Sequence, residues 1–114
     1  MKTYDARMKA LWRDDPTEAS MTVDLRLDAQ TQSVLAPWDI FGAFDLDGGY
    51  SRPFILRRDG EIDFGVGAPH RWRTNLRAIR VGVGACFQVF WNETDVGEYK
   101  VVKIARLGSR DENG

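Results

Sequence analysis

The chain of 114 residues has one cysteine, Cys86, and one histidine, His70, so it offers few of the side chains on which catalysis usually depends. A single histidine excludes sites built on two histidine ligands, and one cysteine with one histidine cannot complete a zinc cage without carboxylates. Cys86 lies in the apolar run RVGVGACFQVFW of residues 80–91, where a cysteine is expected to be a small buried side chain with little thiolate. We therefore expect no metal, no cofactor and no cysteine nucleophile.

Paired carboxylates are the remaining route to an enzyme. Asp45 and Asp47 are two residues apart and would share one face of a strand. Together with Asp39 and an arginine or His70, they could supply the acid and base of a small hydrolase-like enzyme. Nothing in the sequence fixes these groups near one another, so such an enzyme is the alternative to a binding protein, and catalytic residues are not assigned.

A binding function is favoured by the arginines and aromatic residues in the second half of the chain. Residues 52–92 carry seven arginines and three acids, and arginine binds carboxylates and phosphates through two parallel hydrogen bonds. Tryptophan suits a partly exposed contact surface because its ring is large and carries one polar atom. We expect a small anionic or aromatic ligand, or a protein partner, to be bound by Trp38, Trp72, Arg73, Arg77, Arg80, Gln88 and Phe90.

The same charges allow two other interpretations. Acidic and basic strands can face one another across a sheet and neutralise each other, which would leave no anion site. The sequence of residues 70–77 interleaves aromatic and cationic side chains in the manner of a nucleic-acid surface, but a pI near 5.8 argues against nucleic acid as the partner.

The elements that must position these residues are indicated by the hydrophobic period. Apolar residues alternate with polar ones over residues 4–12 and 21–28, which predicts two half-buried strands. Residues 38–46 also favour a strand, although Pro37 and Gly48 could bracket a short helix. Asp59-Gly60 lies between two apolar runs and predicts a hairpin with a type I′ turn.

The run from Arg77 to Trp91 raises a separate question. A straight strand of this length would extend about 50 Å, which is more than a domain of this size can accommodate. Gly82 and Gly84 are therefore expected to let the strand bend. The even positions from Arg80 to Phe90 form a flat face that we expect to be covered by another layer of the chain, by a ligand or by a partner. Self-association through this face is the simplest arrangement.

The fold that follows is all-β: a small antiparallel barrel or sandwich of about seven or eight strands, with at most one short helical turn. Residues 1–108 are expected to form a single domain, and residues 109–114 a disordered tail. No apolar run is long enough to span a membrane, and the N-terminal residues lack the apolar stretch of a signal peptide. With a single cysteine, this predicts a cytoplasmic protein that does not bind a membrane. The flat face of residues 80–90 predicts that it is a homo-oligomer.

Overall fold

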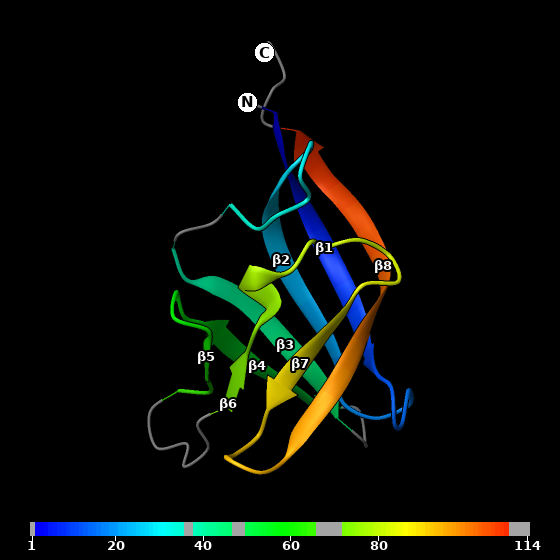
Figure 1. Ribbon diagram of the computed structural model, residues 1–114, viewed down its shortest axis with the longest axis vertical. Coiled ribbons are helices and arrows are strands. Elements are labelled where there is room, and N and C mark those ends of the chain that lie inside the picture. The colour runs from blue at the N-terminus through cyan, green and yellow to red at the C-terminus, as the bar shows by residue number, and fades with distance from the viewer. Residues whose placement is uncertain (1, 36–37, 47–49, 66–71, 110–114) are drawn as a thin grey trace.

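The computed structural model describes residues 2–35, 38–46, 50–65 and 72–109, and it shows an antiparallel closed β-barrel (Figure 1). Each strand pairs with its neighbours in the sequence, and the first strand pairs with the last. The all-β prediction is confirmed, and the open choice between barrel and sandwich is settled as a barrel. The elements are β1 (Thr3–Trp12), β2 (Ser20–Asp28), β3 (Ile40–Leu46), β4 (Tyr50–Leu56), β5 (Glu61–Asp63), β6 (Trp72–Thr74), the 3₁₀ turn η2 (Leu76–Ala78), β7 (Cys86–Phe90) and β8 (Val96–Ser109).

The two strands with the clearest alternation place their apolar residues inside the barrel. In β1 the side chains of Ala6, Met8 and Ala10 are fully buried, while Arg7 and Lys9 between them are exposed. The register sets Met8 opposite the buried Val23 of β2. A shift of one residue would turn every one of these side chains to the other face, so the hydrophobic pattern fixes the register.

Closure of the barrel depends on the long pairing between β1 and β8, which is interrupted by two bulges. Lys9 is opposite Lys103 and Ala10 is opposite Val101, so Val102 has no partner on β1. At the other bulge Leu107 is skipped in the same way. A bulge bends its strand and redirects a side chain. Val102 and Leu107 are both left exposed on the outer wall.

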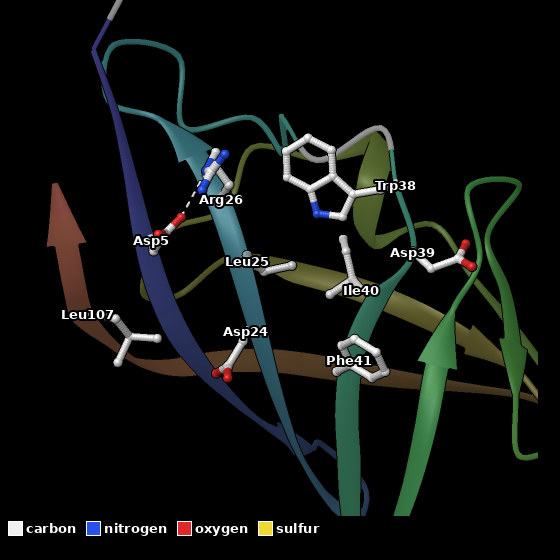
Figure 2. A pocket seen from close by; sticks show the side chains of 9 residues that line it. All are labelled: Asp5, Asp24, Leu25, Arg26, Trp38, Asp39, Ile40, Phe41 and Leu107. Carbon is white, nitrogen blue, oxygen red and sulfur yellow. Dashed lines mark hydrogen bonds and ion pairs between the residues drawn. The ribbon is translucent and has the colours of Figure 1, made fainter. Parts of the chain in front are cut away.

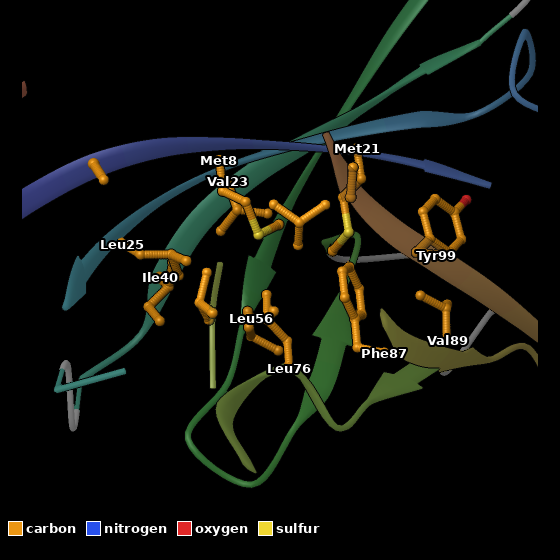
Figure 3. Close-up of a cluster of buried hydrophobic side chains, with 14 of the residues drawn as sticks. Met8, Met21, Val23, Leu25, Ile40, Leu56, Leu76, Phe87, Val89 and Tyr99 are labelled. Atoms are coloured by element: carbon orange, nitrogen blue, oxygen red, sulfur yellow. The ribbon is translucent and has the colours of Figure 1, made fainter. Parts of the chain in front are cut away.

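Side chains fill the interior, as expected for a barrel of eight strands. Figure 3 shows side chains from β1, β2, β3, β4, β7 and β8, together with Leu76 of η2, converging on one core. At one end the core is aromatic, where the ring of Phe44 packs against Phe54 and Trp72. The largest fully buried side chains are Tyr99, Phe44, Phe87, Met8, Met21, Leu27, Leu56, Ile62 and Leu76.

Two inward-facing glycines make space for aromatic rings. A Cβ atom at Gly42 would lie 2.5 Å from the ring of Phe54 on the neighbouring strand. A Cβ atom at Gly97 would lie 2.5 and 2.6 Å from ring carbons of Trp91 and 3.2 Å from Nε1 of Trp12. These two tryptophan rings meet edge to face, with centroids 5.3 Å apart. The absence of a side chain at Gly97 is thus a packing requirement.

Replacing Gly97 with alanine is expected to lower the free energy of unfolding by about 1–3 kcal/mol, because the added methyl group overpacks the tryptophan pair. Gly82→Ala is the matched control, since a Cβ atom there would meet nothing within 4 Å. Urea unfolding monitored by tryptophan fluorescence measures both variants. Equal stability of the two variants would contradict this account of Gly97.

Residues 40–46 form a strand, as the alternation predicted, and the hairpin around Gly60 is also present. The predicted turn type is wrong. Asp59 does not have the positive φ that a type I′ turn needs, whereas Gly60 does, at +92°. The amide of Gly60 donates to the carbonyl of Arg57, and the amide of Arg57 donates to the carbonyl of Glu61. This is the longer type of hairpin loop, in which glycine follows the turn and forms a bulge.

The prediction of one bent strand over residues 77–91 is wrong. Residues 79–85 leave the sheet and connect two distant parts of the barrel. On one side the amide of Val81 donates to the carbonyl of Gln32, and on the other the amide of Gly84 donates to the carbonyl of Val101. Gly84 has a φ of +94° in a turn, which explains why glycine stands there. The buried side chains of Leu76 and Val81 complete the core beneath this connection.

The even positions of this segment are not covered by another layer of the chain. Cys86 and Phe90 are exposed because β7 turns them to the outer wall, and Arg80 and Gly84 are exposed in the connection before β7. The expectation that Cys86 is buried is wrong for the same reason, since its neighbour Phe87 occupies the inward position.

The C-terminal end of the chain and the connection after β1 were also predicted from the sequence. Ser109, predicted to begin a disordered tail, belongs to β8, and residues 110–114 lie outside the described residues. The Asp15-Pro16 segment forms a turn in which the carboxylate of Asp15 accepts a hydrogen bond from the amide of Thr17. Within the described ranges, no helix has the length and apolar character needed to cross a membrane.

The buried hydroxyl group of Tyr99 is expected to make the stability of the fold depend on pH. It donates to the carbonyl of Ala19 at 2.9 Å, and burial raises the pKa of Tyr99 well above its ordinary value of 10.0. Above pH 10 the unfolded chain loses this proton while the folded chain keeps it. The contribution of the Tyr99 proton to stability is therefore fully present below pH 10. Above pH 10 the free energy of unfolding falls by up to about 1.4 kcal/mol per pH unit.

Urea unfolding between pH 7 and 11.5 tests this, with Tyr99→Phe as the comparison. The variant is expected to be less stable by about 1 kcal/mol at pH 7, because the carbonyl of Ala19 loses its donor. Its decline above pH 10 should be shallower than that of the unaltered protein. Parallel declines would show that another group is responsible.

Candidate functional site on the outer wall

Arg77, one of the three arginines expected to bind an anionic group, is turned toward backbone carbonyl groups. Its guanidinium donates to the carbonyls of Trp38 at 2.7 Å, Leu56 at 3.1 Å and Arg57 at 3.1 Å. Partial burial lowers the pKa of Arg77 from its ordinary value. The side chain ties the segment before β3 to the β4–β5 hairpin, so its contacts in the structure are those of a structural arginine.

The other residues predicted to bind are spread over the barrel. Arg73 and Phe90 lie opposite each other on β6 and β7, but the guanidinium of Arg73 donates to the carbonyl of Asp59. The side-chain amide of Asn75 donates to Oε1 of Gln88 and accepts a hydrogen bond from the backbone amide of Gln88. Arg80 is exposed and pairs with Ser33 by a single bridge.

The two tryptophans predicted to be exposed differ. Trp72 packs into the aromatic end of the core, with its ring 5.0 Å from that of Phe64, whereas Trp38 is 49% exposed. Trp72 contacts Phe44 near the end of β3, whereas Trp38 lies just before the start of β3. The structure therefore brings Trp38 and Arg77 together, places Arg73 beside Phe90, and does not gather the seven residues into one site.

The structural role of Arg77 can be measured. Arg77→Gln is expected to lower the free energy of unfolding by about 2 kcal/mol, because three carbonyl groups lose a charged donor. Arg80→Gln removes the same charge from an exposed position and is expected to change stability by less than about 0.5 kcal/mol. Chemical denaturation compares the two variants. A neutral effect of Arg77→Gln would refute the anchoring role.

The carboxylates of the alternative enzyme do not converge in the described residues. Asp39 is bonded to Arg57 at 2.8 Å, while Asp45, near the other end of β3, accepts a long hydrogen bond from Ser20. Asp47 and His70 lie outside the described residues. No group of three or more histidine, cysteine, aspartate or glutamate side chains that could hold a metal ion is found within the described ranges.

A groove lies on the outer wall, where β2 and β3 separate. The pairing of these strands runs from Ser20–Asp45 to Val23–Gly42, and beyond it the strands diverge. The resulting hollow has a volume of about 360 Å³. Figure 2 shows its lining, to which β1, β2, β3 and the end of β8 contribute. The residues are Asp5, Asp24, Leu25, Arg26, Trp38, Asp39, Ile40, Phe41 and Leu107.

Phe41 stands at the centre of this surface. Its side chain is 69% exposed, although it is a large apolar residue in the middle of a sheet. A second hollow of about 240 Å³ shares Phe41 and Asp24 with the first and extends along Thr22 and Ala43. Phe41 is thus a projecting ring with a hollow on either side.

The charges of the groove are balanced by ion pairs. Arg26 is bonded to Asp5 at 2.9 Å, Arg7 to Asp24 at 2.8 Å, and Arg57 to Asp39 at 2.8 Å. Only the pair between Arg57 and Asp39 joins the arginine-rich segment to the acidic first part of the chain, whereas the other two pairs lie within that first part. Since each aspartate of the groove has an arginine partner, the surface offers apolar contact area and little net charge.

The outer face of the β3–β4 hairpin is apolar beside this groove. Phe41 lies opposite Ile55, and Ala43 opposite Pro53, so four outward positions on two strands carry no charge. We call these four residues together with Trp38 the hairpin face. The signal in the sequence was the break in alternation at residues 40–44, where Ile40 and Phe41 are apolar in succession, but it does not show which of them faces outward.

No family model, curated protein or solved structure matches the chain.

Proposed function

We propose that the chain is a non-enzymatic binding module that associates with a second copy of itself through the hairpin face. The observation that carries the proposal is Phe41, an exposed ring between two hollows. A projecting residue beside a recess suits a two-fold interface, because each copy then supplies both the ring and the space that receives it.

Three further features support a second copy as the occupant. The hairpin face carries no charge of its own, and the ion pairs at the groove leave no excess of one sign to repel an identical surface. The net charge of the whole chain is −1, so long-range repulsion between copies is weak. Aromatic residues at the centre of a contact surface contribute most of the binding energy in protein interfaces.

Sedimentation velocity over a range of protein concentrations tests the proposal. The unaltered chain is expected to pass from monomer to dimer as its concentration rises. Phe41→Asp is expected to raise the dissociation constant by about 30-fold or more, because it places a charge at the centre of the interface and removes an anchoring ring worth about 2 kcal/mol.

Tyr50→Ser is the matched control for this experiment, since Tyr50 is also a highly exposed aromatic residue (73%) but lines neither hollow. It should leave the dissociation constant unchanged. A chain that stays monomeric at every concentration, or a Phe41→Asp variant that associates as well as the unaltered chain, would overturn the proposal.

A further inference from the structure

A second surface, on the wall where β1 and β8 meet, carries lysines without acidic partners. Lys9 and Lys103 lie directly opposite each other in the register, and Lys100 lies opposite Leu11. All three side chains are exposed, and none forms an ion pair with a described residue. The chain has four lysines in all, so three of them gather at this place. We call these three residues the lysine patch.

The neighbouring charges on the same wall behave differently. Arg7 is bonded to Asp24 and Arg13 to Glu98, so each of these arginines has an acidic partner. Like charges directly opposite each other on neighbouring strands repel and cost stability. The lysine patch keeps such a pair, Lys9 with Lys103, in a chain whose net charge is −1. The local excess of positive charge is therefore a specific feature of this wall.

An apolar hollow adjoins the lysine patch. Its volume is about 280 Å³, and Lys100 and Arg13 stand among its lining residues. The unpaired residue of the bulge, Val102, forms part of the wall because the bulge leaves it facing outward. The remaining lining is apolar or aromatic and consists of Leu11, Trp12 and Pro16.

We infer that this hollow and the lysine patch together bind a small amphiphilic anion. The apolar body of the ligand occupies the hollow beside Leu11 and Val102, and its carboxylate or phosphate group receives hydrogen bonds from the ammonium group of Lys100. Lys9 and Lys103 lie outside the hollow and add electrostatic attraction for the anion. Binding of the anion also reduces the repulsion between these two lysines. The volume suits a chain of about eight carbon atoms rather than a drug-sized molecule, since pockets for the latter usually reach 300–1,000 Å³.

Titration of the isotopically labelled protein with octanoate, followed by amide chemical shifts, tests this site directly. Shifts are expected at residues 9–16 and 99–104, and they should saturate at millimolar ligand. Octyl phosphate serves as the second arm and distinguishes a preference for phosphate from one for carboxylate. Octanol has the same chain without the charge and is expected to bind at least 10-fold more weakly.

The lysines are tested by the double substitution Lys100→Gln with Lys103→Gln, which is expected to weaken octanoate binding at least fivefold. Arg58→Gln removes a cation from the exposed turn between β4 and β5 and is the control, with no expected change. Raising the salt concentration from 0.05 to 0.5 M should weaken binding to the unaltered protein, because exposed charges are screened.

Three results would overturn the inference: no saturable shift with either anion up to 10 mM, equal affinity for octanol and octanoate, or shifts that map to a different wall. The hairpin face lies on β3 and β4, so dimer formation by the same protein can be measured separately and does not decide this outcome.

Discussion

The pairing of β1 with β8 is the constraint on which the rest of the structure depends. It joins the two ends of the sheet along most of the length of both strands, and through it Met8 and Val101 face the same core. The two bulges within it determine which residues of β8 point outward. Without this pairing the sheet would expose its interior aromatic residues, and Val102 would have no fixed place beside Leu11. Both the filled interior and the character of the outer wall follow from how these two strands meet.

Arginines and lysines on the outer wall make different kinds of contact. Arginine has a planar group with five donors. Here Arg77 donates to three carbonyl groups, and Arg57 joins Asp39 to Asp63 at the surface, which raises the pKa of Arg57. Lysine carries a compact charge on a flexible stem that lies easily along apolar surface. Lys9, Lys100 and Lys103 on β1 and β8 are exposed and form no ion pair with a described residue. Arg57 and Arg77 of the arginine-rich segment therefore bond to other parts of the fold, whereas the lysines of β1 and β8 form a positive surface.

Much of the fold could be predicted from the sequence, because the alternation of apolar and polar residues over 4–12 and 21–28 indicates both the strand and its buried face. The hairpin at Gly60 was equally clear, although the backbone angle of Asp59 was not. The segment before β7 could not be predicted, because its hydrogen bonds go to Gln32 and Val101, which are remote in the sequence. The candidate sites were hidden for the same reason. Lys9 and Lys103 become neighbours only when the barrel closes, and Phe41 could be placed outside only once Gly42 was known to face Phe54.

Closure between strands at opposite ends of the sequence also shapes how the chain reaches its folded state. The hairpins β1–β2, β2–β3 and β3–β4 involve residues close in sequence, so they can form while the chain is still incomplete. Until β8 docks, β1 and β7 each present a row of backbone groups without partners, and such edges recruit strands from other molecules. The arrival of β8 removes both edges at once. The interval before it arrives is the period in which this protein is most exposed to aggregation.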